Sequence, residues 1–165
     1  ESNVIYAEHF RMPNNLCNVP VFPVTNGPKN DRLLRLAQAK VRRAAAEISR
    51  GIVRRRGFSR ASVRLGRSQS VFWPGVESAA AKDVWIDESC VRCGLCARIC
   101  PTGNLSLGEN GVEQAGRCMV CYRCVNACPK SAITVLIHAK PRRRYLGVSG
   151  NFIRDAEEDA GRTEI

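Results

Sequence analysis

Apolar and polar residues alternate in three short stretches of the C-terminal half of the chain, as expected for half-buried β-strands. These stretches are VWID at 84–87, LSL at 105–107 and ITV at 133–135. The residues GENG at 108–111 are typical of a tight turn and lead directly into VE at 112–113. The pattern therefore predicts a hairpin over 105–113 and two further strands around it.

A different period governs residues 31–52, where apolar side chains recur at helical spacing. The stripe contains Leu34, Ala37, Val41, Ala45, Ile48 and Ile52, while Arg and Lys occupy the other face. Asp31 stands where a side chain can cap the first turn. The sequence predicts one long amphipathic helix over 31–52.

The stretch VIYAEHF at 4–10 reads as a strand, and a loop with four prolines separates it from this helix. A single strand and helix cannot bury the apolar stripe, so we expect a larger sheet to cover it. Residues 53–82 are rich in Arg, Ser and Gly and read as a basic linker with at most one turn of helix. Residues 141–165 read as a charged tail, ordered only near Tyr145 and Phe152.

Sliding the chain over itself exposes an internal repeat with an offset of 28 residues. The run CVRCGLCARICP at 90–101 aligns with CMVCYRCVNACP at 118–129, so that every cysteine meets a cysteine. The match continues into the strands, because LSL meets ITV. Residues 83–140 therefore read as two copies of one small unit.

Cysteines at this spacing predict iron–sulfur ligation. A cubane cluster has four iron corners, and each needs one soft thiolate. Three cysteines on a turning loop can reach three corners, and where such a run occurs twice the fourth cysteine of each run binds the other cluster. This assigns Cys90, Cys93, Cys96 and Cys128 to cluster I, and Cys118, Cys121, Cys124 and Cys100 to cluster II. Pro101 and Pro129 turn the chain away after each fourth ligand.

Neither zinc nor disulfides suit these cysteines. Zinc does not call for CxxCxxC followed by CP twice, and disulfides between cysteines so close in sequence would close strained loops. Cys17 has no neighbouring cysteine, and we expect a buried or incidental thiol there. The clusters predict one-electron chemistry at low potential, with unequal surroundings because Gly94 aligns with Tyr122.

The chain carries a formal charge of +11, which is concentrated in one segment. Residues 31–70 contain 12 Lys and Arg against 2 Asp and Glu. A solvated face, an acidic redox partner and nucleic acid could each explain this segment. Nucleic acid is the least favoured, because the aromatic residues of a stacking platform are not interleaved with the arginines.

With these motifs in view, residues 83–140 resemble the bacterial-type dicluster 2[4Fe-4S] ferredoxins. The resemblance implies an α+β fold with pseudo-twofold symmetry, two [4Fe-4S] clusters and no catalytic residues. Over most of residues 1–140 the chain also resembles the C-terminal part of flavodoxin–ferredoxin fusion proteins. VIYAEHFRMPNN, the helix after it and the later CPTGN carry that resemblance.

The fusion resemblance implies that residues 1–52 are the last strand and helix of a flavodoxin-like α/β domain. The Ser/Thr-rich loop that holds the FMN phosphate is not in this sequence, so FMN would bind only if a missing upstream flavodoxin-like domain is present. The chain begins at Glu1, and we expect the natural protein to extend further at this end.

These observations predict a cytoplasmic electron-transfer protein that is not an enzyme by itself. It would relay electrons between a flavin or other donor and a partner reductase, with an acidic redox protein or flavodoxin-like domain as partner and no membrane span. One alternative is the C-terminal electron-transfer part of a flavin-dependent oxidoreductase. A less favoured alternative is a nucleic-acid-binding protein with structural clusters.

Overall fold

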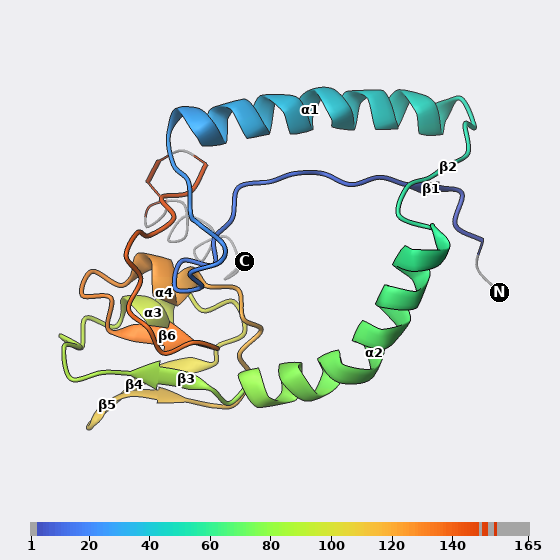
Figure 1. Cartoon of the computed structure of the whole chain (residues 1–165). Coiled ribbons are helices and arrows are strands. Elements are labelled where there is room, and N and C mark those ends of the chain that lie inside the picture. Colours follow the sequence, from blue (N-terminus) through green and yellow to red (C-terminus); the bar gives the residue numbers. More distant parts are fainter. Residues whose placement is uncertain (1–2, 149, 152–153, 155–165) are drawn as a thin grey trace. The chain divides into compact units, whose positions relative to one another are not determined.

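A computed structural model describes residues 3–148, 150, 151 and 154 (Figure 1). The chain divides into two compact units. Residues 1–13 and 28–74 form unit 1, and residues 14–27 and 75–165 form unit 2. The expectation of order near Phe152 lies outside the described residues.

Unit 1 is built on two short parallel strands joined through a long helix. Strand β1 (Tyr6–Ala7) pairs with β2 (Arg54–Arg55), and α1 (Pro28–Ser49) lies between them in the chain. Tyr6 lies opposite Arg54 in the register. Parallel neighbours need such a crossover, because a tight turn can join only antiparallel strands. The predicted strand at 4–10 is thus real but shorter than expected.

Helix α1 begins three residues earlier than the sequence predicted. Pro28 fits the first turn because its fixed φ suits a helix and its missing N–H would have no partner there. Asp31 lies within the first turn, where a negative charge is favourable, and not at the cap. Gly51 ends the helix with a φ of 70°, and the N–H groups of Gly51 and Ile52 donate to the carbonyls of Ile48 and Glu47.

The apolar stripe of α1 is only partly covered. Ala37 is buried and Leu34 half-buried, but Val41 and Ile48 are each about half exposed. This agrees with the expectation that a strand and a helix cannot bury the stripe without a larger sheet.

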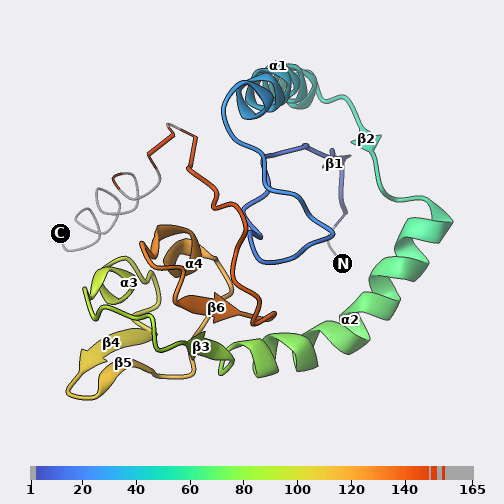
Figure 2. The same cartoon turned by 60° about the vertical axis from the view of Figure 1, so that its left-hand side comes forward.

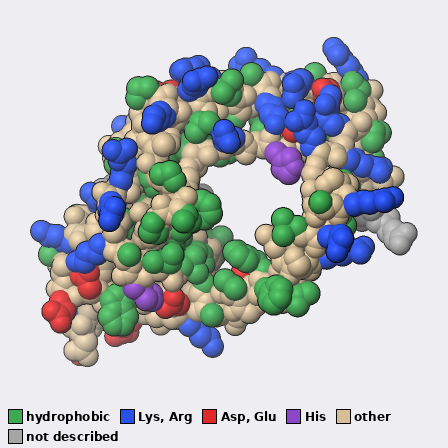
Figure 3. Space-filling model, in the orientation of Figure 1, with side chains coloured by type: hydrophobic (Ala, Val, Ile, Leu, Met, Phe, Trp, Pro, Cys, Tyr) green, Lys and Arg blue, Asp and Glu red, His purple; other side chains and the backbone are tan. Residues whose placement is uncertain are grey.

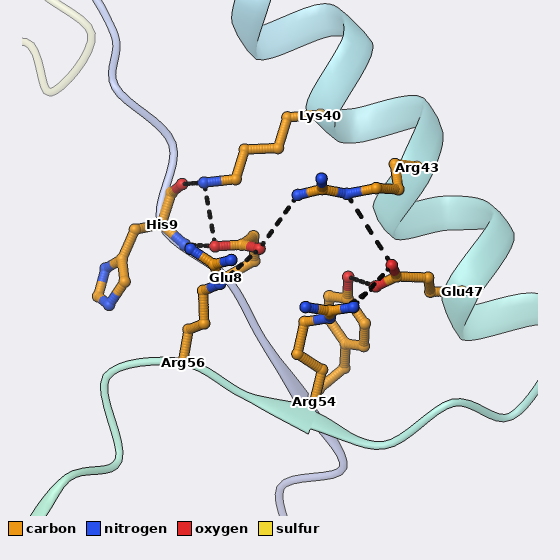
Figure 4. Close-up of polar contacts among 8 residues, drawn as sticks. Glu8, His9, Lys40, Arg43, Glu47, Arg54 and Arg56 are labelled. Carbon is orange, nitrogen blue, oxygen red and sulfur yellow. Dashed lines mark hydrogen bonds and ion pairs between the residues drawn. The ribbon is translucent and has the colours of Figure 1, made fainter.

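Two buried or half-buried carboxylates tie β1 and β2 to α1 (Figure 4). The Glu8 side chain is 2% exposed and lies 3.0 Å from Lys40, 3.3 Å from Arg56 and 3.7 Å from Arg43. Glu47 accepts two hydrogen bonds from Arg54, at 2.8 and 2.9 Å, and one from the Tyr6 hydroxyl at 2.6 Å. Part of the basic segment is therefore engaged in ion pairs within unit 1.

The expectation of a loose linker over 53–82 was wrong. Residues Arg60–Ala80 form helix α2, and Ser59 caps it by accepting the N–H of Ser62 on its Oγ at 3.2 Å. Pro74 lies inside this helix, and its ring removes one backbone donor. Sequence analysis missed α2 because its Arg, Ser and Gly content resembles that of a loop.

Unit 2 contains two antiparallel ladders related by the internal repeat. Strand β3 (Val84–Ile86) pairs with β6 (Ile133–Val135), and β4 (Leu105–Gly108) pairs with β5 (Gly111–Gln114) as the expected hairpin. Each ladder joins the first strand of one repeat to the last strand of the other. The strand predictions for this half are confirmed.

Two short helices lie against these strands (Figure 2). Helix α3 (Leu95–Arg98) contacts β4, α4 (Arg123–Ala127) contacts β6, and the two helices contact each other. The core consists of Val84, Leu105, Tyr122, Val125, Ile133 and Val135, with Leu95, Ile99 and Ala127 in a smaller cluster. The cysteine loops are thus mounted on a core that both repeats share.

Figure 3 shows Lys and Arg side chains gathered along α1. Among the described helices, none is long and apolar enough to cross a bilayer.

Candidate metal centre

The two cysteine loops have the same backbone conformation, including residues in the left-handed region. Such residues are rare outside glycine because Cβ approaches the following carbonyl. Three pairs related by the 28-residue offset share this conformation: Arg92 and Val120 (φ 55° and 54°), Gly94 and Tyr122 (72° and 62°), and Gly103 and Ser131 (57° and 51°). The repeat in sequence is therefore also a repeat in loop geometry.

The first cavity of unit 2 gathers cysteines from both loops. Cys90, Cys93 and Cys96 line it together with Cys128 of the other run. Apolar side chains, Ile86, Leu95, Val112 and Ile133 among them, form much of the remaining wall.

The second cavity repeats this arrangement with the loops exchanged. Cys118, Cys121 and Cys124 line it together with Cys100 of the first run. Val84, Leu105, Tyr122 and Val135 contribute to its wall. The eight cysteines singled out from the sequence thus fall into two groups of four, each with three from one run and the fourth from the other.

Backbone N–H groups point at the sulfur atoms. Asn104 donates to Sγ of Cys100 and Ala132 to Sγ of Cys128, both at 3.2 Å, and these donors are equivalent under the repeat. Val120 donates to Sγ of Cys118 at 3.4 Å. Donors of this kind stabilise negative charge on sulfur, whether on a thiolate or on an iron-bound sulfur.

The electrostatics of the thiols fit a cation between them. Burial raises the pKa of Cys96, Cys118 and Cys124, and the neighbouring thiolates raise each pKa further. At Cys100 burial also acts to raise the pKa, but hydrogen bonds from Thr102, Asn104 and Leu105 outweigh it and hold the pKa below its usual value. Four thiolates can share one apolar cavity only when positive charge compensates them, and iron supplies that charge.

The thiols do not form a ready-made site for a single metal ion. Among the described residues, no three His, Cys, Asp or Glu side chains are close enough to hold one metal ion. Ligands of a single zinc ion nearly touch one another, whereas the core of a cubane keeps its thiolates apart. All nine cysteines are free, so none is engaged in a disulfide. The donor set fits a four-iron cluster in each cavity.

Cys17 is not among the residues that line these two cavities. It packs against the main core of unit 2, and burial raises the pKa of its thiol to about 11. The thiol is therefore half-buried, where a buried or incidental thiol was expected.

Sequence reasoning missed the polar side chains that contact the loops from outside. Asn15 donates to the Cys121 carbonyl at 3.1 Å and Arg144 donates to the Cys128 carbonyl at 2.6 Å. Both contacts join residues distant in the chain, and no local pattern announces them. Arg144 stands in a run of three arginines that reads as solvated surface.

Comparison with known proteins agrees with this geometry. Residues 89–132 match the family model for the 4Fe-4S dicluster domain. A ferredoxin of Methanocaldococcus jannaschii is 34% identical over 70 residues, which cover 39% of this chain and 90% of that protein. No solved structure matches the chain.

Longer relatives match over part of their length. The thiosulfate reductase electron transfer subunit of Salmonella typhi is 30% identical over 113 residues, covering 65% of this chain and 53% of the subunit. A polyferredoxin of Methanothermus fervidus is 41% identical over 46 residues, covering 28% of this chain and 11% of that protein. The chain therefore spans about half or less of these two relatives.

Proposed function

The chain belongs to the ferredoxin family of 4Fe-4S proteins, and from this premise we propose that it relays single electrons at low potential between a flavin or other donor and a partner reductase. The observation that carries the proposal is the gathering of eight cysteines into two apolar cavities, four in each. The chain performs no bond chemistry itself and serves as an electron carrier.

We assign the ligands as a crossed pair. Cys90, Cys93, Cys96 and Cys128 hold cluster I, and Cys118, Cys121, Cys124 and Cys100 hold cluster II. The linings of the two cavities support this assignment. Crossed ligation ties the two repeats together, just as each strand ladder joins one repeat to the other.

When bound, each [4Fe-4S] cluster supplies a one-electron couple. The residues of the chain hold and tune it. Cysteine thiolates bind iron, and the N–H groups of Asn104 and Ala132 donate to ligand sulfurs, which stabilises added negative charge. Apolar side chains around both cavities partly shield the ligands from water.

Residues 1–52 are the last strand and helix of a flavodoxin-like domain in this proposal. The parallel pairing of β1 with β2 and the half-exposed stripe of α1 support it, because parallel strands are normally buried in larger sheets with both faces covered. FMN would bind only if the rest of such a domain precedes these residues. The chain would be the electron-transfer part of a flavin-dependent oxidoreductase.

An acidic redox protein or an acidic flavodoxin-like domain is the partner that the charge favours. Residues 31–70 contain 12 Lys and Arg against 2 Asp and Glu, so ion pairs with Glu8 and Glu47 neutralise only part of the charge of this segment. A reducing compartment such as the cytoplasm suits a chain whose nine cysteines form no disulfide.

The deciding experiment is a reductive EPR titration with iron and sulfide analysis on anaerobically purified protein. We expect about eight iron atoms, four in each cluster, and two interacting spins after full reduction. Zinc in place of iron, about four iron atoms, or clusters that cannot be reduced reversibly would refute the proposal.

A further inference from the structure

Two segments far apart in the chain close over the second cysteine loop. Asn126 is buried in α4, donates to the carbonyls of Asn15 and Tyr122 at 2.9 and 3.0 Å, and accepts the N–H of Tyr145 at 2.7 Å. Asn26 donates to the Arg144 carbonyl and accepts the N–H of Leu146, both at 3.0 Å. Two asparagines therefore fix the backbone of residues 144–146.

The fixed backbone directs the Arg144 side chain at a cluster ligand. Its Nη1 donates to the carbonyl oxygen of Cys128 at 2.6 Å, and the residue is half-buried. The carbonyl also accepts the N–H of Ser131 at 3.1 Å, as the equivalent carbonyl of Cys100 accepts Gly103 at 3.1 Å. Arg144 lies outside the repeated residues 83–140, so the repeat does not supply the first copy with a matching arginine.

A second arginine also contacts the carbonyl of a cysteine that lines the first cavity. Arg98 Nη1 donates to the Cys93 carbonyl at 3.3 Å. The equivalent carbonyl in the second loop, that of Cys121, accepts the neutral amide of Asn15 instead. Asn126, which is neutral, takes the place of Arg98 in the repeat.

Other cations lie near both cavities, and Arg117 donates to the Gly103 carbonyl at 2.9 Å in the turn after Cys100. Lys130 lines the first cavity and Arg123 lines the second, so each cavity has one basic wall residue. The guanidinium groups of Arg98 and Arg144 contact the carbonyls of Cys93 and Cys128, which both line the first cavity.

We propose that Arg98 and Arg144 raise the reduction potential of cluster I above that of cluster II, so that an electron on this protein resides in the first cavity. The inference rests on the proposed crossed ligation. Reduction adds one negative charge to the cluster, and a nearby cation stabilises the reduced form more than the oxidised form. Arg144 acts the more strongly, because a half-buried charge is screened less than an exposed one.

The test compares Arg144→Gln and Arg98→Gln with Arg143→Gln, by EPR-monitored redox titration of the whole chain. Arg143 is the matched control, because it is exposed and is the sequence neighbour of Arg144. We expect Arg144→Gln to lower the equilibrium constant of the first, higher-potential reduction about tenfold, which is 59 mV for one electron. Arg98→Gln should lower it by a smaller factor, and Arg143→Gln should leave it within about twofold. Arg144→Lys keeps the charge and should restore most of the wild-type value.

The iron content distinguishes failure of the proposed function from failure of the inference about Arg98 and Arg144. If the wild type lacks eight irons or reversible reduction, the proposed function fails. If both clusters assemble and Arg144→Gln matches Arg143→Gln, the inference alone is wrong, and it is equally wrong if the lower-potential step moves instead. If Arg144→Gln loses iron, the Arg98→Gln variant provides the test, because Arg98 is exposed. A higher reduction potential that is unchanged in Arg98→Gln would then overturn the inference.

Discussion

Tyr122 occupies in the second cysteine loop the place that Gly94 holds in the first, and both have left-handed backbones, with φ of 62° and 72°. Tyr122 is also the largest fully buried side chain in the described part of the chain. In the second loop a non-glycine residue therefore has a strained backbone, and its aromatic ring is buried in the core that both repeats share.

This relationship predicts an unusual order of stability. Tyr122→Ala should destabilise the protein by roughly 3–5 kcal/mol through loss of the buried ring. Tyr122→Gly loses the same ring but relieves left-handed strain of about 1–2 kcal/mol, so it should be the less damaging change. Tyr122→Phe should cost under about 1 kcal/mol, because its hydroxyl is 3.4 Å from the Val135 carbonyl. Anaerobic denaturant titrations measure all three, and a glycine variant less stable than the alanine variant would contradict the strain.

Crossed ligation predicts which loop loses its cluster when a fourth cysteine is replaced. Cys128→Ser should reduce the iron content to about four and expose Cys90, Cys93 and Cys96 to iodoacetamide. Cys100→Ser should expose the cysteines of the second loop instead. Mass spectrometry of the alkylated protein identifies the reactive residues, and Cys17→Ser is the control that should keep both clusters. Reaction at Cys118, Cys121 and Cys124 in the Cys128→Ser protein would show that ligation is not crossed.

The attachment of β1 and β2 should weaken in acid. The Tyr6 hydroxyl and Arg54 hold the pKa of Glu47 below its usual value. At Glu8 burial alone would raise the pKa, but the N–H of His9 and the charges of Lys40 and Arg56 lower it overall. A carboxylate with a lowered pKa in the folded state stabilises it above the unfolded pKa of about 4.5, and this stabilisation disappears as the pH falls through the folded pKa.

Hydrogen exchange detects that loss at the Arg54 and Arg56 amides, which donate to Ile5 and Ala7 across the two strands. After correction for intrinsic rates, exchange should accelerate as the pH falls below about 4.5. Glu47→Gln should exchange faster than the wild type at neutral pH and depend less on pH. Glu77→Gln, on the exposed surface of α2, should behave like the wild type.

Asn126 should be far more important to stability than an average asparagine. Asn126→Ala leaves the Asn15 carbonyl and the Tyr145 N–H without this partner, and we expect a loss of roughly 2–4 kcal/mol. Asn110→Ala, in the exposed hairpin turn, should change stability by less than about 0.5 kcal/mol. Equal effects in anaerobic denaturation would mean that the two segments do not depend on Asn126.

The proposed acidic partner predicts salt-sensitive electron transfer. With an acidic flavodoxin as acceptor, the second-order rate constant should fall steeply between about 0.01 and 0.1 M salt, where the screening length falls from about 30 to 10 Å. Stopped-flow absorbance measures this rate. A rate constant that does not depend on ionic strength would show that the basic residues do not contribute to docking with the acceptor.

The sequence predicted unit 2 better than unit 1, because the patterns that define unit 2 are short-range and occur in both copies of the repeat. Alternating residues and a repeated cysteine run defined the strands around both loops, and the hairpin over Leu105–Gln114 followed from its turn residues. Helix α2 escaped prediction because a single serine cap and a mixed composition gave little signal. Arg144 escaped because its role depends on Asn26, 118 residues away in the chain, and on a carbonyl oxygen that no side-chain pattern encodes.

Of the nine cysteines, all within the described residues, only Cys93 is exposed to solvent. Cys93 is therefore the ligand of the first cavity that redox partners and oxidants in solution can approach most closely. We therefore expect damage in air to begin at that corner and to remove the first cluster before the second. The exposed side of the first cavity is thus the expected site both of electron transfer and of oxidative damage.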